Sequence, residues 1–339
     1  MKIDDLRTYA FNQNLPLDVN IELTQKCNFK CPHCYCPEDK SYLSLESIKK
    51  IIDKCHKAGV LFINFTGGEA MLRKDFLTIY RYAKSLGFMV SIQSNLSYIS
   101  DNLKSEFISF KPKNIAVTIY GSSDGEYLSF TGMKNGYTNV INNLNFLWEN
   151  NISFSLKAAL TKGTYQSILS GQYDQIASKY GKEITYDGVI FGRKDGDITS
   201  ISQRLSPEEI VIFDRSDKDG TIFWNEKIHE ICGQDGIKCG GGISSFSIDS
   251  VGYASICSLY ISEKFEFLER DFNDVWRDLN LSHQRMQQNY KNSQCSNCNK
   301  KSICRWCSAY SVLEHGDPKK PVQFMCNLAE ARVVGSGIR

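Results

Sequence analysis

The chain of 339 residues has the composition of a globular protein with a well-buried core. Hydrophobic residues make up 42% of it and charged residues 23%, which argues against wholesale disorder. The 40 Lys and Arg residues nearly balance the 38 Asp and Glu residues, and the formal net charge is +2. Nucleic-acid or membrane-surface binding usually requires a basic excess, so this balance supports neither.

Neither a transmembrane stretch nor a secretory signal core is evident in the sequence. No stretch approaches the roughly 20 apolar residues of a transmembrane helix, and the N-terminus MKIDDLRTYAFNQNLPLDV has no apolar signal core. We therefore expect a cytoplasmic protein, in which thiols stay reduced. The 13 cysteines are then better explained as metal ligands or redox groups than as disulfides.

Apolar stretches alternate with amphipathic ones through the first half of the chain. We expect six strands, at 17–23, 60–65, 88–94, 114–120, 152–160 and 183–191. Ser44 is the expected N-cap and Gly59 the expected C-terminal stop of the first of four helices, at 44–59, 74–87, 136–151 and 166–180. This alternation predicts an α/β fold, with helices outside a parallel sheet that forms an open or closed barrel. Ligands of such folds collect at the carboxyl ends of the strands.

The alternation gives way to turn-forming sequence after about residue 192, and the remaining cysteines begin at Cys232. We expect a small, metal-held domain in this part of the chain. The predicted organisation is an N-terminal extension, a barrel, a bridging segment, a cysteine-rich domain and a tail, at 1–16, 17–200, 201–231, 232–330 and 331–339.

The segment CNFKCPHCYC places Cys27, Cys31 and Cys34 in a C-x3-C-x2-C pattern after the first predicted strand. Three such thiolates can hold three irons of a cubane cluster and leave the fourth iron open. A closed zinc site that also uses Cys36 or His33 is the alternative, and the spacing alone does not separate the two. The second strand ends in TGGE, whose glycines allow a close backbone approach to a ligand. A tight turn would explain the glycines by themselves, but together with the cysteine loop they form a specific signal.

With these two motifs, the chain resembles the radical S-adenosylmethionine (SAM) enzymes. The resemblance implies a partial (β/α)6 barrel in which Cys27, Cys31 and Cys34 bind a 4Fe–4S cluster, and SAM chelates its open iron. It implies further SAM contacts, of which the first three line the amino end: Gly67, Gly68, Glu69, Asn95, Thr118, Lys157 and Tyr35. Tyr35 is included because His33 replaces the usual aromatic residue near the adenine, and QSNL at 93–96 replaces the usual Thr-Asn-Gly turn.

Eight further cysteines lie in the C-terminal third, four of them in CSNCNKKSICRWC at 295–307. Paired C-x2-C elements also build zinc ribbons, so a zinc site is again the alternative. The set resembles the SPASM extension of radical SAM enzymes, which carries two auxiliary 4Fe–4S clusters. The resemblance assigns Cys232, Cys239, Cys257 and Cys307 to cluster I, and Cys295, Cys298, Cys304 and Cys326 to cluster II. Two residues, Arg305 and Trp306, separate Cys304 from Cys307, where the usual pattern has three.

Five other side chains receive simpler interpretations. We expect Cys36 to be a small buried side chain, although a redox or hydrogen-donor role is the alternative, and Cys55 to pack in the core. We expect solvated surface positions for His229, His283 and His315. No residue is singled out as catalytic, because nothing in the sequence identifies the group that handles substrate protons.

The resemblance implies three 4Fe–4S clusters, SAM and a peptide-modifying activity. Reductive cleavage of SAM would give a 5′-deoxyadenosyl radical that removes hydrogen from a ribosomally made precursor peptide, leading to a cross-link, a thioether or a similar modification. The alternatives are a sulfatase-maturating, formylglycine-generating enzyme and a non-catalytic Fe–S or zinc protein. The expected partners are the peptide and an electron donor such as flavodoxin or ferredoxin. A separate leader-binding protein is a further possibility, because some 16 residues before the first strand are too few for a domain of roughly 50 residues.

Overall fold

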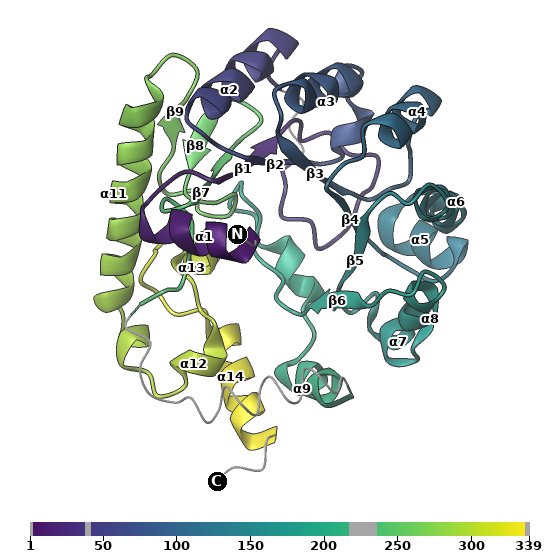
Figure 1. Ribbon diagram of the computed structural model, residues 1–339. Helices are drawn as coiled ribbons and strands as arrows, with labels where there is room; N and C mark the ends of the chain where they lie inside the picture. The colour runs from purple at the N-terminus through teal and green to yellow at the C-terminus, as the bar shows by residue number, and fades with distance from the viewer. Residues whose placement is uncertain (1–2, 38–41, 217–235, 336–339) are drawn as a thin grey trace.

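The computed structural model describes residues 3–37, 42–216 and 236–335. Its centre is a nine-stranded sheet in the order β6-β5-β4-β3-β2-β1-β7-β8-β9, with helices outside its curve (Figure 1). The strands are β1 (Asp18–Glu22), β2 (Phe62–Thr66), β3 (Met89–Ser94), β4 (Asn114–Thr118), β5 (Phe154–Ala159), β6 (Ile184–Asp187), β7 (Ser245–Ile248), β8 (Tyr253–Ser255) and β9 (Phe265–Glu266).

Strands β1 to β6 pair in parallel and confirm the six predicted strands. Side chains alternate between the two faces of each strand. On β1, Val19 and Ile21 are buried in the core between sheet and helices, whereas Asn20 and Glu22 lie on the opposite, inner face. This inner face is polar on neighbouring strands too, since Asn64 pairs with Asn20 in register and donates a 2.8 Å hydrogen bond to it.

Seven helices cover the outer face of β1 to β6 in the part of the chain that the structure describes (Figure 1). Ser44 caps the first of them as predicted, because its hydroxyl accepts from Ser47 N. Gly171, at φ +74°, divides the predicted helix 166–180 into two. The seven are α2 (Leu45–Lys57), α3 (Phe76–Ser85), α4 (Asp101–Ser109), α5 (Asp124–Thr131), α6 (Gly136–Glu149), α7 (Tyr165–Leu169) and α8 (Gln172–Ser178). Cys55 on α2 is fully buried in the core, as predicted.

The C-terminal region continues the barrel sheet, which the sequence did not indicate. Strand β7 pairs in parallel with β1, and β8 and β9 follow in antiparallel pairing. The long helix α11 (Phe272–Lys291) lies along this end of the sheet, and α9 (Pro207–Ser216) packs on α14 (Gln323–Gly335) at the open side (Figure 1). The remaining elements are η1 (Ala70–Leu72), η2 (Thr199–Gln203), η3 (Gln294–Asn297), α12 (Lys301–Cys304) and α13 (Ser308–His315). The predicted domain limits stay predictions, although α14 crosses the proposed limit at residue 330.

The N-terminal helix α1 (Ile3–Asn12) lies at the amino ends of the first strands. Ala10 packs with Leu17 and Phe62 there, and Arg7 forms a 3.0 Å ion pair with Asp18. Because α1 covers this edge, the site must be sought at the opposite, carboxyl edge. No helix in the described ranges is long and apolar enough to cross a membrane.

Candidate cluster and cofactor site

The cysteine loop and the glycine turn meet at the carboxyl edge of β1 and β2. Gly68 N donates to Thr24 O at 2.8 Å, and Glu69 N donates to Lys26 O at 2.9 Å. A Cβ on Gly67, at φ +146°, would lie 2.2 Å from Thr24 O, and a Cβ on Gly68 would lie 2.4 Å from Lys26 O. The glycines are therefore needed for contact with the chain's own backbone, which fixes the start of the cysteine loop.

Glu69 joins this turn to the end of β3. Its carboxylate accepts hydrogen bonds from Asn95 N at 2.7 Å, Ser94 Oγ at 2.9 Å and Met71 N at 3.2 Å. The residue is only 1% exposed, and burial raises its pKa to about 7. The side chain thus holds two turns of the carboxyl edge together, and the predicted place of Glu69 at the amino end of SAM stays a prediction.

Asn95 connects the third turn to the cysteine loop. Its Nδ2 donates to Asn28 Oδ1 at 3.0 Å and lies 3.7 Å from Cys27 Sγ, within reach of a weak hydrogen bond to sulfur. Its Oδ1 accepts from Ser97 N and Ser97 Oγ. QSNL therefore supports the loop despite its departure from the usual turn, and the contact of Asn95 with SAM stays a prediction.

The three predicted cluster thiols lie together in this loop. Burial, with a contribution from Cys34, raises the pKa of Cys27 to about 11, and burial together with both partner thiols raises that of Cys31 well above 9. The pKa of Cys34 falls to about 6, first because the Cys36 thiol hydrogen-bonds to it. Cys36 is partly buried, and its Sγ lies 3.9 Å from Glu22 Oε1.

This donor set fits a 4Fe–4S cluster that takes three thiolates from one loop. The Cys36 thiol hydrogen-bonds to Cys34, so it lies within reach as a fourth thiol ligand, as in the closed zinc site that is the alternative. Within the described residues, no three His, Cys, Asp or Glu side chains converge as the ligands of a single metal ion would.

The two rings beside Cys34 have different surroundings. His33 stacks on Phe130 with centroids 5.3 Å apart, burial lowers its pKa to about 4, and its Nδ1 is buried without a hydrogen-bond partner in the described structure. Tyr35 instead lies beneath Lys194, whose Nζ is 5.4 Å from the ring centroid. The predicted contact of Tyr35 with the adenine of SAM stays untested.

The last two predicted SAM contacts lie side by side on the inner face of the sheet. Thr118 on β4 pairs in register with Lys157 on β5, and Lys157 is exposed. Both positions face the same side as Asn20 and Glu22, so an inner-face ligand could contact them.

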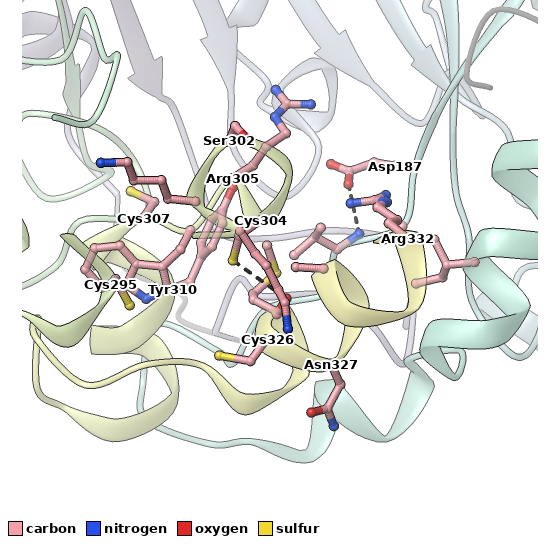
Figure 2. Close-up of a pocket in the computed structure, with 18 of the residues that line it drawn as sticks. Asp187, Cys295, Ser302, Cys304, Arg305, Cys307, Tyr310, Cys326, Asn327 and Arg332 are labelled. Atoms are coloured by element: carbon pink, nitrogen blue, oxygen red, sulfur yellow. Dashed lines mark hydrogen bonds between the residues drawn. The ribbon is translucent and has the colours of Figure 1, made fainter. Parts of the chain in front are cut away.

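The C-terminal cysteines form two groups. In the first, burial raises the pKa of Cys307 to about 12, with smaller contributions from Cys257 and Cys239. In the second, burial raises the pKa of Cys304 to about 12, with contributions from Cys326, Cys295 and Cys298. Cys304 and Cys326 lie close together in Figure 2. All four thiols of the second group, and Cys239 and Cys307 of the first, line a cavity of about 1100 Å³.

This division matches the two sets that the resemblance implied, except that Cys232 lies outside the described residues. Helix α12 ends at Cys304, and Arg305 follows in a left-handed conformation at φ +53°. That reversal separates Cys307 from the group of Cys304. Ligation of iron by these thiols stays a prediction.

The predicted surface positions of the histidines have mixed outcomes. His315 is exposed as expected, and His229 lies outside the described residues. The prediction for His283 is wrong, because this side chain is 9% exposed and its Nδ1 lies 2.7 Å from Gly241 O. Its place on the packed face of α11, four residues from Leu279, is the signal that would have identified it.

Sequence reasoning also missed the ion pair of Lys194 with Glu22 beside the cysteine loop. Lys194 Nζ lies 3.1 Å from Glu22 Oε2, and both side chains are at most 10% exposed. The polar alternation Asp18, Asn20, Glu22 within an otherwise apolar strand was the available signal for an inner polar face. Nothing in the sequence pairs Glu22 with a lysine that follows 172 residues later.

The fold is a parallel α/β barrel with a three-cysteine loop at the carboxyl edge of its first strand. This combination is typical of domains that bind an iron–sulfur cluster. Residues 21–163 match the family model described as the Radical SAM superfamily, and this part of the chain is a radical SAM domain. A domain of this kind implies SAM and one 4Fe–4S cluster. The expectation of an enzyme is confirmed at the level of the family.

Curated relatives match the chain over different lengths. An S-adenosylmethionine-dependent nucleotide dehydratase of Selenomonas ruminantium is 43% identical over 79 residues, which are 23% of this chain and 29% of that protein. An AdoMet-dependent heme synthase of Methanosarcina barkeri is 20% identical across 90% of this chain and 94% of its own length. The mycofactocin maturase MftC of Mycobacterium tuberculosis is 21% identical, with coverages of 86% and 77%.

Two solved structures share the fold over nearly the whole chain. SuiB of Streptococcus suis, bound to S-adenosylmethionine, matches with a TM-score of 0.71 at 16% identity. The match covers 95% of this chain and 78% of the SuiB chain. Native anSMEcpe with bound AdoMet has a TM-score of 0.71 at 15% identity, with coverages of 96% and 100%. These matches extend through the cysteine-rich C-terminal region, so the predicted fold of a radical SAM barrel with a SPASM region is confirmed.

Proposed function

We propose that the chain is a radical SAM/SPASM maturase that modifies a residue of a ribosomally made precursor peptide. The observation that carries the proposal is the loop of Cys27, Cys31 and Cys34, held against the glycine turn at the carboxyl edge of the sheet. The polar inner face of the sheet continues from this loop and offers a surface for a polar substrate.

The peptide substrate is supported by what the relatives bind or act on. SuiB has been solved bound to the precursor peptide SuiA, and anSMEcpe with the peptides Kp18Cys and Cp18Cys. MftC is a maturase, and another relative is a PqqA peptide cyclase. An electron donor such as flavodoxin or ferredoxin would be required, and a separate leader-binding protein is a further proposed partner.

The bound cluster and SAM would supply reductive cleavage of the sulfonium, giving a 5′-deoxyadenosyl radical that removes a hydrogen atom from the peptide. Cys27, Cys31 and Cys34 would hold that cluster. Asn95 Nδ2 and Phe29 N would stabilise the Cys27 thiolate, because both point a donor at its sulfur. Glu69 keeps the turns after β2 and β3 in fixed relation to the loop.

Two auxiliary 4Fe–4S clusters complete the proposal. Cys239, Cys257 and Cys307 would hold the first with Cys232, and Cys295, Cys298, Cys304 and Cys326 would hold the second. The grouping of their thiols supports this assignment. Gly241 N, which lies 3.3 Å from Cys239 Sγ, would support a thiolate there.

The test is anaerobic reconstitution with iron and sulfide, followed by SAM, reductant and candidate precursor peptides under mass spectrometry. We expect about 12 iron atoms per chain, four for each cluster, together with 5′-deoxyadenosine and a peptide that has lost two hydrogens. Cys27→Ala should lose about four irons and all 5′-deoxyadenosine, whereas Cys55→Ala, a buried cysteine outside every group, should keep both. Wild-type protein that loads iron but never cleaves SAM would overturn the proposal.

A second candidate is the formylglycine-generating type. It is favoured by the match to anSMEcpe, which this chain covers over 100% of its length, and by the peptides solved with that protein. The two candidates differ in their product. An aldehyde that reacts with a hydrazide probe would identify this second type, and a product without an aldehyde that has lost two hydrogens would identify a cross-linking maturase.

A further inference from the structure

A polar recess of about 110 Å³ opens on the inner face of the sheet beside the cysteine loop. Glu22 from β1, Thr66 from β2 and Ser247 from β7 line it from the sheet. Gln25 from the start of the cysteine loop and Lys194 from the segment after β6 complete its wall. Four separate stretches of the chain thus contribute these polar side chains to one small space.

Two polar atoms in this recess have no partner. Gln25 Oε1 and Ser247 Oγ are both buried and make no hydrogen bond within the described structure, and Ser247 is 4% exposed. Buried polar atoms in folded proteins are nearly always paired with protein or with water. Gln25 and Ser247 both line the recess, so a guest there lies beside two polar side chains with unused hydrogen-bonding capacity, whichever way the Gln25 amide is turned.

The charged groups of the recess are already paired. Lys194 Nζ lies 3.1 Å and 3.3 Å from the two oxygens of Glu22, and Lys264 Nζ lies 2.8 Å from Asp249 Oδ2. A charged guest would be buried without a counter-ion, which is strongly unfavourable. An apolar guest would leave the Gln25 and Ser247 atoms unsatisfied. The chemistry of the recess therefore suits a neutral group that hydrogen-bonds.

The recess adjoins both regions proposed to hold clusters. Lys194 N donates to Tyr35 O at 3.0 Å, next to Cys34, and Ser258, which follows Cys257, also lines the recess. A substrate side chain placed here would be near both the cysteine loop and the first auxiliary group. We propose that the recess binds a neutral, hydrogen-bonding side chain of the peptide substrate, with a carboxamide as its simplest form. This inference rests on the proposed function.

The test is a set of anaerobic soaks of crystals of the reconstituted holoenzyme. The probes are the blocked residues N-acetyl-asparagine, N-acetyl-aspartate and N-acetyl-leucine, each as its N-methylamide, at one concentration. We expect the asparagine side chain in the recess, within hydrogen-bond distance of Gln25 and Ser247, and neither other side chain. An empty recess in the asparagine soak, or entry of the aspartate or leucine side chain, would overturn the proposal, as would entry of the asparagine probe by its backbone.

Variants separate the recess from general effects on folding. In Ser247→Ala the asparagine occupancy should fall, and in Gln25→Met/Ser247→Ala the leucine probe should replace it. Ser250→Ala is the matched control, because the Ser250 hydroxyl is also buried and unpartnered but does not line the recess. Unchanged asparagine occupancy in the Gln25→Met/Ser247→Ala protein would contradict the proposal.

Release of 5′-deoxyadenosine by the same preparation keeps this proposal apart from the proposed function. If the protein cleaves SAM but the recess stays empty, only the proposal for the recess is contradicted. If the asparagine side chain binds in the recess but SAM is never cleaved, the proposed maturase activity is contradicted.

Discussion

At Gly68, a single missing side chain sets the position of the cysteine loop. A Cβ there would lie 2.4 Å from Lys26 O and 2.5 Å from Gln25 O, so Gly68→Ala must push the loop away from the turn. We expect a loss of about 1–3 kcal/mol in stability and at least about tenfold weaker SAM binding, measured by equilibrium dialysis on reconstituted protein. Gly125→Ala is the control, because Gly125, like Gly68, has no positive φ, and its Cβ would make only an ordinary contact, 3.8 Å from Ser123 Oγ. Equal SAM affinity in both variants would contradict this role.

His283 gives the stability of the C-terminal region a pH dependence. Burial lowers its pKa below 6.5, while its Nδ1 donates to Gly241 O when the ring is neutral. The unfolded chain takes up a proton near pH 6.5 that the folded chain resists. The stability that this residue contributes is therefore present above pH 6.5 and is lost as the pH falls toward the lowered pKa.

His283→Leu should flatten this acid dependence and cost about 1–3 kcal/mol at pH 8, because Gly241 O loses its partner. Urea unfolding between pH 5 and 8 measures both effects. His315→Leu, at an exposed position, should change neither the slope nor the stability at pH 8. A His283→Leu curve parallel to that of the wild type would contradict the assignment.

At the scale of elements, Lys54 joins α2 of the barrel to the segment between β9 and α11. Its Nζ donates to Phe267 O, Leu268 O and Arg270 O at 2.9, 2.6 and 2.7 Å. Lys54→Met keeps the length of the side chain but removes the ammonium group that donates to these carbonyls. We therefore expect the free energy of unfolding to fall by about 1.5–3 kcal/mol. Chemical unfolding against Lys50→Met, an exposed lysine of the same helix, measures it. Equal losses in the two variants would show that the contact has no special role.

The elements that the sequence predicts well are those with a strong local pattern. Each of β1 to β6 lies in an apolar or alternating stretch between turn signals, and Ser44 marks the start of α2 by its own side chain. Strands β7 to β9 are only four, three and two residues long, and pairing with β1 rather than local pattern defines them. Helix α11 has a detectable spacing of buried residues at Val275, Leu279 and Met286, so careful use of periodicity would have found it.

At the scale of the whole molecule, the same contrast applies to the candidate site. Cys27, Cys31 and Cys34 are close in the chain, so their spacing alone indicates a shared site. The recess depends on Glu22, Lys194 and Ser247, which are distant in sequence and meet only because β7 pairs with β1 and the segment after β6 folds over the cysteine loop. Such long-range contacts leave no local pattern, and only the folded chain reveals them.

The division of the C-terminal thiols predicts how paired substitutions affect iron content. Cys257→Ala/Cys307→Ala removes two thiols from the group of Cys239, and we expect loss of about four iron atoms. Cys304→Ala/Cys307→Ala removes only one thiol from each group and leaves three described thiols in the group of Cys326. Three thiolates are also what the N-terminal loop offers its cluster, so we expect this second pair to keep more iron in total than the first. Iron and sulfide analysis after anaerobic reconstitution measures the difference, with Cys55→Ala as the control. If Cys307 instead belonged with Cys304, the second pair would remove two thiols from one group, and the cluster of that group would be lost. Cys257→Ala/Cys307→Ala would then remove one thiol from each group. The second pair, and not the first, would have the lower iron content.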